Sequence, residues 1–582
     1  MSKKDDKIFH LGLSMAGAVS AGAYTAGFID YLLEALNSWE VAKNKERNNP
    51  TGSIPMHNVM IDAIGGASAG GMVSMITTLA FYSGKIEPVR KVSNTKTGNI
   101  LYDSWVFLDD DDSLYDGNGL GKTTFEKMLM TDDLDGKIGA PSLLNSKPID
   151  KIAENIFEKL PKNASINNFP KYISKSLRVL LTLTSLRPLD YKIKLSNIKS
   201  KFLDFTPGHR ISNHDLVAHF KVDYDSTLDK DKFLPFRPLK AELDKSSNQD
   251  LLIKTTKATG AFPVGLAPRY FDNDLTMNYV QTDLKRRKNF SSKMDIEFES
   301  RNVPNFQFTA VDGGAINNEP FDEVLRCLVS NHGQADVDNP KFGTLLIDPF
   351  PNFEDANITK KVNYDKRGML DIIGALVPTI LNQARNKRSD TYATSLFKVM
   401  SFPRKYELGN LKNAIKHPLA TGGIGGFGGF LDIEFRKHDF FLGRKNAKNF
   451  LRGIFFLEYN SNDKNNLFYG ISQEMIDKFG KTVDGLTYMP IIPDVNILDS
   501  NDDGNPTRYE IQDIPKFDSK AFKKLEKPIQ NRLRVILKKE LGTNLSGWLW
   551  WLFGGIVINK ISKKITKWVI NTIQEDFEKR GM

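Results

Sequence analysis

The chain has 582 residues, more than a single hydrophobic core usually holds, which predicts one large elaborated domain or two to three domains. Its apolar content of 40% and charged content of 26% are ordinary for a globular protein, and the net charge of +10 suits an anionic partner surface. Because no arginine-rich arm or nucleic-acid motif is present, we expect no nucleic-acid partner.

Cysteine content and the N-terminal residues indicate the cellular compartment of the protein. The one cysteine, Cys327, excludes an intrachain disulfide and a zinc cluster of cysteines, and its apolar surroundings predict a buried structural thiol. The first residues run into a strand-like segment without a signal-peptide core, which predicts a cytoplasmic protein. No stretch of 18 or more uninterrupted apolar residues occurs, so we expect no transmembrane helix.

Residues 8–14 predict the first strand, which enters a run of small residues between Met15 and Tyr24. A helix is expected to follow through Leu36, and the polar residues 39–55 predict an exposed connection. A loop of small residues between strand and helix can bring bare backbone N–H groups close to an anion.

A second strand is predicted at residues 58–64, and a glycine-flanked serine follows it. Gly66, Ser68 and Gly70 precede an apolar helix at 72–82, which is the strand–turn–helix context of a nucleophile elbow. The glycines are required because the turn strains the serine backbone, and the N-terminus of the helix favours developing negative charge. The alternative is a glycine-rich turn that only packs a helix on a sheet. Two such units in succession predict a parallel sheet covered by helices.

Four segments together carry a family resemblance. Residues 17–22, 66–70, 257–268 and 311–320 are similar, in this order, to the conserved blocks of patatin-like phospholipases, with a looser likeness to an extended bacterial subgroup. The resemblance implies an α/β fold, a three-layer α/β/α sandwich with a mainly parallel central sheet, here with large insertions and a C-terminal extension. It further implies a lipid acyl hydrolase without cofactor or metal.

The resemblance also implies the site residues. Ser68 would be the nucleophile and Asp312 the general base of a Ser–Asp dyad, while the oxyanion hole would be formed by backbone N–H groups of Gly17, Ala18, Val19 and Ala69. Of the eight histidines, none lies in a recognisable catalytic context. Physically, Asp312 needs a desolvated setting that raises its pKa, and the glycines that follow it permit close backbone approach.

The loop at residues 17–22 departs from the family pattern Gly-Gly-Gly-x-Arg/Lys-Gly. It reads Gly-Ala-Val-Ser-Ala-Gly, so the β-branched Val19 would be strained wherever φ must be positive, and Ala21 removes a basic side chain. Loss of one oxyanion donor costs on the order of a hundredfold in rate. A catalytically silent lipid-binding protein therefore stays as the alternative to a hydrolase. A Ser–Asp–His α/β-hydrolase is disfavoured, because Ser68 follows only one strand–helix unit.

We expect three regions along the chain. Residues 7–350 would form the catalytic domain, with 84–250 as an insertion that either lines or covers a lipid pocket or adds sheet and packing. Residues 351–540 would be a C-terminal elaboration packed on this core, and 541–582 a membrane-interfacial segment. An amphipathic helix is predicted from Ile149 to Leu160 and a buried strand at 177–186.

The C-terminal elaboration contains two motifs that resemble ligand-binding loops. The glycine-rich residues 422–430 lack a Gly-Lys-Ser/Thr ending and a preceding strand, so we do not expect a nucleotide site. Residues 499–510 fit a calcium loop, but Pro506 and the flanking prolines favour a solvated acidic turn. Between these motifs, the polar residues of 432–451 predict a structural ion-pair network, with lipid phosphate as the alternative partner: Arg436, His438, Asp439, Arg444 and Asn446.

The C-terminal residues 545–558 are apolar but too short to span a bilayer. Four of the six tryptophans lie at or after Trp548, interleaved downstream with lysines, as in an interfacial amphipathic segment. The alternative is a helix docked in a groove of the core. We expect a peripheral protein on the inner face of the membrane that acts on phospholipid or another acyl-lipid, with head group, acyl chain and oligomeric state left open.

Overall fold

The computed structural model describes most of the chain. The described residues are 7–116, 120–136, 139–194, 208–288, 296–298, 303–333, 340–350, 398–401, 403–407, 410–498, 513–542 and 547–582. The calcium-like loop at 499–510 lies outside these residues, as do the side chains of Trp548, Trp550 and Trp551.

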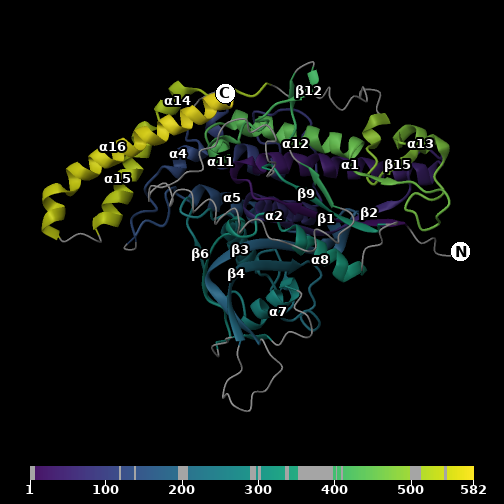
Figure 1. The fold of residues 1–582 in the computed structure, drawn as a ribbon, viewed down its shortest axis with the longest axis horizontal. Helices are drawn as coiled ribbons and strands as arrows, with labels where there is room; N and C mark the ends of the chain where they lie inside the picture. Colours follow the sequence, from purple (N-terminus) through teal and green to yellow (C-terminus); the bar gives the residue numbers. More distant parts are fainter. Residues whose placement is uncertain are drawn as a thin grey trace, which may run out of the picture.

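A ten-stranded mixed sheet runs through the molecule in the order β10-β9-β1-β2-β3-β4-β5, with β6, β7 and β8 joined to it through β3 and β8 (Figure 1). Strands β10, β9, β1, β2 and β3 pair in parallel, whereas β3 pairs antiparallel with β4, β7 and β8. The strands are β1 Ile8–Met15, β2 Asn58–Gly66, β3 Ile173–Lys194, β4 Gly208–Lys221, β5 Leu234–Pro235, β6 Arg269–Phe271, β7 Ile296–Phe298, β8 Phe308–Asp312, β9 Phe342–Ile347 and β10 Lys398–Ser401.

Helices cover both faces of this sheet, which confirms the predicted α/β fold. Helices α1 (Gly22–Asn48) and α12 (Ile433–Gly453) pack together on one side, and α8 (Phe321–His332) lies on the other (Figure 1). Gly12 of β1 and Gly65 of β2 let α8 approach, because a Cβ there would lie 2.5 and 2.8 Å from methyl carbons of Val324.

Further helices and two small sheets complete the chain. The α-helices are α2 Ser68–Ser83, α3 Ile100–Tyr102, α4 Thr124–Met128, α5 Lys147–Glu158, α6 Gln249–Thr259, α7 Met277–Lys288, α11 Gly423–Gly426, α13 Gln473–Phe479, α14 Ser519–Lys523, α15 Glu526–Gly542 and α16 Gly547–Lys579. One-turn 3-10 or π segments include η1 Val19–Ala21, η2 Asp103–Phe107, η5 Gly313–Ala315 and η6 Gly428–Phe430. The small sheets pair β11 Tyr406–Glu407 with β12 Asn410–Ala414, and β15 Leu486–Pro490 with β13 Phe456–Glu458 and β14 Lys481–Val483.

Helix α1 is longer than the sequence predicts. It continues past Leu36 to Asn48, so the expectation of an exposed connection from residue 39 is wrong for its first ten residues. Trp39 is buried and its indole donates a hydrogen bond to Pro55 O at 2.8 Å, while buried Lys43 donates to Asn58 Oδ1 at 3.0 Å. The polar composition concealed this contact because a lysine can bury its stem and still satisfy its ammonium group.

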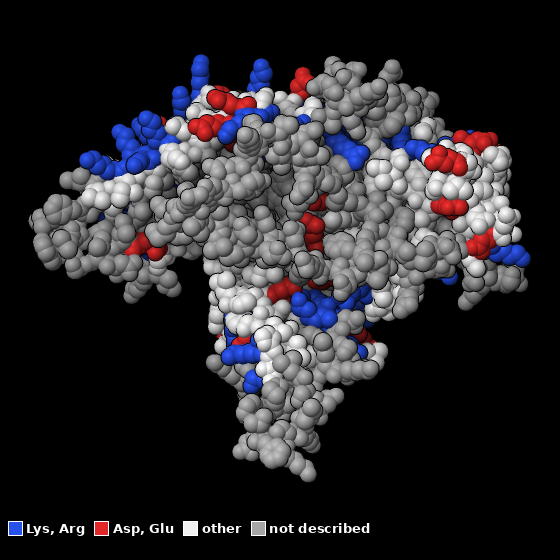
Figure 2. Space-filling model, viewed as in Figure 1, with Lys and Arg blue, Asp and Glu red and all other residues white. Residues whose placement is uncertain are grey.

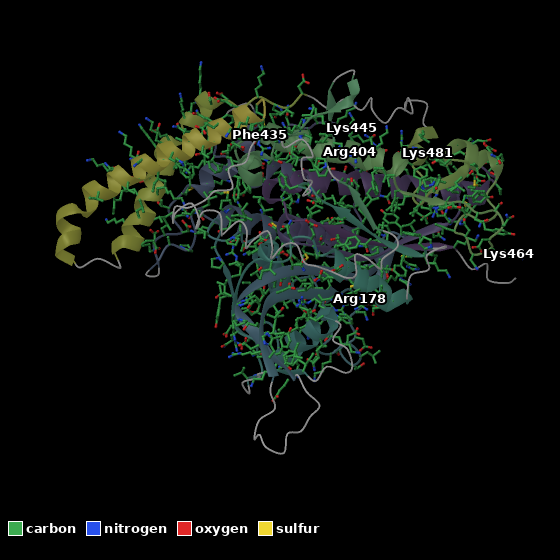
Figure 3. The ribbon with its side chains drawn as sticks, in the orientation of Figure 1. Arg178, Arg404, Phe435, Lys445, Lys464 and Lys481 are labelled. Carbon is green, nitrogen blue, oxygen red and sulfur yellow. The ribbon has the colours of Figure 1, made fainter. Side chains whose placement is uncertain are left out.

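Helices α15 and α16 form a hairpin that projects from one end of the molecule (Figure 1). One side of α16 is buried through Ile570, Ile573 and Phe577 in a cluster shared with α15 and α12. The ring of Phe577 lies 5.6 Å from that of Phe435 of α12, measured between centroids, and Phe435 is labelled in Figure 3. This part of the chain therefore does dock on the core. Among the described helices, none has both the length and the apolar character needed to cross a bilayer.

Candidate active site

Ser68 lies at the sharp turn between β2 and α2. Its backbone has φ = 50° and its side chain is buried. A Cβ on Gly66 would overlap the backbone of Gly70, and a Cβ on Gly70 would overlap the carbonyl of Met15. The strained serine between two glycines that have no room for a side chain is the geometry that a nucleophile elbow requires.

The loop after β1 reaches the elbow. Gly17 N–H donates to Asn318 O at 3.1 Å, and a methyl group placed on Gly17 would lie 3.0 Å from Ser68 Cβ. Val19 has φ = 49° and lines the same pocket as Ser68 and Ala69. The sequence indicated that a β-branched residue would be strained here at positive φ, and the structure places Val19 in that conformation.

The glycine-rich segment 422–430 packs against this loop. Ser20 Oγ donates to Gly426 O and accepts a hydrogen bond from Gly429 N–H at 2.9 Å. Gly429 has no room for a side chain, because its Cβ would lie 2.6 Å from Ser20 Oγ. The segment thus supports a loop 400 residues earlier in the chain, and Phe430 at its end also lines the pocket. Its glycines were visible in the sequence, but nothing local showed their partner.

Helix α12 holds that segment in turn. Buried Arg436 donates to Gly429 O and to Val106 O, both at 2.6 Å, and pairs with Asp110 at 2.5 Å. Burial opposes ionisation of Asp110, but Arg436 and neighbouring hydroxyls outweigh it and keep the pKa of this carboxyl below its ordinary value. Asp439 accepts hydrogen bonds from Ala420 N–H and Thr421 N–H, each at 2.9 Å. The structural ion-pair network predicted for 432–451 is confirmed.

Asp312 ends β8 and is buried. Gly314 N–H donates to its Oδ1 at 2.7 Å, which fixes the carboxylate. On β3, Leu181 pairs with Gly66, and Leu183, two residues further, pairs with Asp312. Because β4 occupies the other edge of β3 at both positions, the elbow and Asp312 follow one another along the same edge of this strand.

The segment after α6 ties both residues together. Thr259 Oγ1 accepts a hydrogen bond from Ser68 N–H at 3.1 Å, and Ala261 O accepts one from Asp312 N–H at 2.9 Å. The four segments singled out in the sequence thus meet at one edge of the sheet. Each is held by backbone contacts rather than by long side chains, so their mutual placement depends on the fold as a whole.

Ser68 lines an apolar pocket of about 520 Å³, a volume that includes space open to solvent. Part of the lining comes from the predicted insertion at 84–250, and hydrocarbon side chains predominate. The lining residues are Val19, Ser68, Ala69, Met72, Ile76, Ser104, Trp105, Leu108, Ile149, Ile152, Gly260, Phe262, Leu266 and Phe430. Such a lining suits a hydrocarbon chain.

No histidine is among the described residues that line this pocket. His57 is buried, bonded to Ile491 O at 2.9 Å, and desolvation lowers its pKa to about 4. Another carboxyl lies at the end of the neighbouring strand β9: burial and, secondarily, Glu319 raise the pKa of Asp348 to about 7. Asp348 is thus a second buried acid near the sheet edge, against which Asp312 can be tested.

A family model described as patatin-like phospholipase matches residues 13–325, more than half of the chain. The chain belongs to the patatin-like phospholipase family. A protein of Sinorhizobium fredii (strain NBRC 101917 / NGR234), described as the uncharacterized protein y4iI, is 26% identical over 581 residues, covering 92% of this chain and 76% of its own length. The crystal structure of VipD from Legionella pneumophila is 13% identical, covers 96% of this chain and 88% of its own, and has a TM-score of 0.20.

The patatin-like match includes all four site segments, and family membership indicates an esterase-type hydrolase that acts on lipid. It ends before the glycine-rich segment 422–430, before α12 and before α16. In this patatin-like protein, the loop at residues 17–22 is therefore packed against a region outside the matched residues.

Proposed function

We propose that this protein is a serine acyl hydrolase that cleaves carboxylic esters of membrane lipids, of phospholipase A or lysophospholipase type. The observation that carries the proposal is the buried Ser68 at the mouth of an apolar pocket, held by the same segment as Asp312. An apolar lining suits an acyl chain, and the ester carbonyl would then lie beside the elbow.

In the proposed reaction, Asp312 accepts the Ser68 hydroxyl proton as Oγ attacks the ester carbonyl carbon. Backbone N–H groups of Ala18, Val19 and Ala69 bind the oxyanion of the tetrahedral intermediate, assisted by the N-terminus of α2. The Gly17 N–H, which the family resemblance also implied as a donor, is instead bonded to Asn318 O. Collapse of the intermediate releases the alcohol, which takes the proton from Asp312, and leaves an acyl-enzyme. Water then attacks, Asp312 accepts its proton, and Ser68 recovers its own as the fatty acid leaves.

The experiment compares the Ser68→Ala and Ser74→Ala variants on phosphatidylcholine vesicles and on a short-chain chromogenic ester. Ser74 is a buried serine six residues further along α2 whose hydroxyl donates to Gly70 O at 2.8 Å, so it is a matched control. Ser68→Ala should reduce hydrolysis by roughly 10⁴-fold or more, because it removes the nucleophile. Hydrolysis that survives Ser68→Ala would overturn the proposal.

A catalytically silent lipid-binding protein is the second candidate, favoured by one observation: the strained Val19 stands in the oxyanion loop. A fluorophosphonate probe separates the two, since only an activated serine reacts with it. Wild-type protein labelled at Ser68 supports the hydrolase, and unlabelled protein that still binds vesicles supports the silent alternative.

We further propose that α16 docks the enzyme on the cytoplasmic face of an anionic membrane. Residues 513–582 contain 15 Lys and Arg against 7 Asp and Glu, and Figure 2 shows basic side chains gathered along the projecting hairpin. Val557, Ile561 and Trp568 are exposed on α16, and Trp568 is 67% exposed. Four lysines lie between them: Lys560, Lys563, Lys564 and Lys567. Exposed apolar side chains among lysines suit an anionic lipid interface.

Co-sedimentation with phosphatidylglycerol-containing vesicles tests this docking. Trp568→Ala should weaken binding several-fold, whereas Leu228→Ala, at a residue 72% exposed elsewhere on the surface, should leave it unchanged. Equal binding by both variants and the wild type would contradict the proposal.

A further inference from the structure

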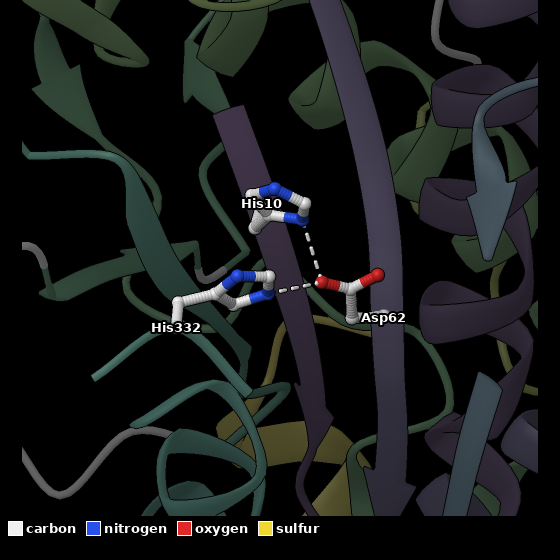
Figure 4. Close-up of side chains that lie close together, drawn as sticks. All are labelled: His10, Asp62 and His332. Atoms are coloured by element: carbon white, nitrogen blue, oxygen red, sulfur yellow. Dashed lines mark hydrogen bonds and ion pairs between the residues drawn. The ribbon is translucent and has the colours of Figure 1, made fainter. Parts of the chain in front are cut away.

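Two histidines and an aspartate from three elements converge beside the sheet. His10 of β1 and His332, the last residue of α8, each place a ring nitrogen 2.7 Å from the same oxygen, Asp62 Oδ2 (Figure 4). The ligand atoms of all three residues lie within 4.8 Å of one another. The imidazole rings stack at 3.7 Å between centroids.

A β-bulge delivers the aspartate to this position. Leu11 pairs with Ile61 and Gly12 with Ala63, so Asp62 is an extra residue on β2, and the register against β3 shifts at the same place. Ala63 packs with Val324 on the α8 side, whereas Ile64 belongs to the main core. Regular alternation would turn Asp62 with Ile64 into that core, and the bulge turns it toward His10 and α8 instead.

The three side chains converge on one point. Asp62 is a buried carboxylate in the middle of an apolar strand, and two side-by-side imidazoles face one of its oxygens. One divalent cation can bind both nitrogens and the carboxylate oxygen, and two imidazoles with one carboxylate are a donor set that suits zinc. The histidine side chains are 21% and 23% exposed, which gives an ion and a water access.

We propose that His10, Asp62 and His332 bind one zinc ion, with water as the fourth ligand. The ion fastens the C-terminal end of α8 to β1 and β2, and α8 is the helix that follows the Asp312 loop. The site is separate from the pocket at Ser68 and does not depend on the proposed hydrolase. It replaces the expectation, made from the sequence, of a protein without metal.

Purified full-length protein is stripped with a chelator and titrated with zinc in competition with a chromophoric zinc indicator. We expect one zinc per chain, with affinity reduced on the order of a hundredfold or more in His332→Ala and in Asp62→Asn, which each remove a ligand. His214→Ala, at a partly buried histidine of β4, is the matched control and should bind as the wild type does.

Thermal unfolding provides a second readout that does not require activity. Zinc should raise the Tm of the wild type and of His214→Ala but not of His332→Gln, which keeps a polar side chain at the end of α8. A wild type that binds zinc no more tightly than the His10→Ala, His332→Ala double variant would overturn the proposal and leave a hydrogen-bonded cluster. A Tm that rises equally in His332→Gln would also overturn it.

Discussion

The elbow and the loop at residues 17–22 each contain a strained backbone position, but the strained residue is supported differently in the two. Ser68 and Val19 are both non-glycine residues at φ near 50°, and both line one pocket. At the elbow, the supporting glycines lie two residues on either side of the serine. At the loop, the support comes through Ser20 from Gly426 and Gly429, some 400 residues later in the chain.

This difference explains why the elbow can be recognised in the sequence and the loop at residues 17–22 cannot. A turn supported by its own neighbours leaves a local signature in the sequence. A loop supported from a distance can exchange its glycines for alanine and valine, provided that the remote segment supplies the missing constraint. The departure at residues 17–22 is therefore paired with the glycine-rich segment and with the buried Arg436 that holds it.

The largest effect should come from removing the remote support. Arg436→Met removes the cation that pairs with buried Asp110 and frees the carbonyls of Val106 and Gly429, which should destabilise the protein by about 4 kcal/mol. Hydrolysis should fall as well, because the oxyanion loop loses its support. Chemical denaturation measures this, with Arg210→Met, which breaks a surface pair with Asp190, as a control expected to cost less than about 1 kcal/mol. Equal losses in the two variants would show that the remote support is unimportant.

The next-largest effect is expected at Asp348, whose carboxyl makes the stability of the protein depend on pH. The folded-state pKa of Asp348 is raised to about 7 from an ordinary value of 3.8, so the neutral carboxyl favours folding below about pH 4 and this contribution is lost as pH rises to about 7. The loss amounts to at most about 4 kcal/mol. Relative to Asp348→Asn, the wild type should become less stable between pH 4 and pH 7 and then change no further. Urea unfolding at several pH values measures the difference, and a difference independent of pH would contradict the assignment.

At the elbow, Gly70→Ala should cost about 3 kcal/mol, because its Cβ would overlap the Met15 carbonyl and force the backbone apart. Hydrolysis should be lost with it. Gly453→Ala at the end of α12 is the control, since its Cβ would meet nothing closer than 3.9 Å. Denaturation midpoints compare the two variants, and a Gly70→Ala protein as stable as the control would show that the elbow has room to spare.

The smallest effect is expected at Val19. Replacement by glycine relieves about 1–3 kcal/mol of backbone strain but adds freedom to the unfolded chain and removes packing, so stability should stay within about 1 kcal/mol of wild type with hydrolysis retained. Ala18→Gly, at φ = −149°, relieves no strain and should be the less stable of the two. The reverse order, measured by thermal unfolding, would mean that Val19 is not strained.

Much of the catalytic core could be predicted from the sequence. The first two strands, the elbow, the amphipathic helix with Ile149 and Ile152, and the strand around Leu181 each carry a local periodicity or turn signal. Asp312 came only from the family resemblance, because one aspartate before two glycines has no local signature of its own. Its relation to the elbow depends on the register of β3, which no local pattern encodes.

What escaped the sequence reasoning are contacts between distant segments. The bulge that turns Asp62 toward His10 and His332 breaks the alternation on which strand predictions depend. The continuation of α1 past Leu36 depends on where Trp39 finds an acceptor. The partner of the glycine-rich segment depends on the docking of α12 and α16. A charged residue inside an apolar strand, such as Asp62 between Ile61 and Ala63, was the one visible sign of the histidine cluster.

The most direct measurement of the central claim is the rate at which a fluorophosphonate labels Ser68 in the wild type, in Asp312→Asn and in Asp348→Asn, with Ser68→Ala as the blank. If Asp312 activates the serine, labelling should fall on the order of a thousandfold in Asp312→Asn and stay within a few-fold of wild type in Asp348→Asn, the other buried aspartate at a strand end. Labelling of Asp312→Asn at the wild-type rate would contradict the Ser68–Asp312 dyad.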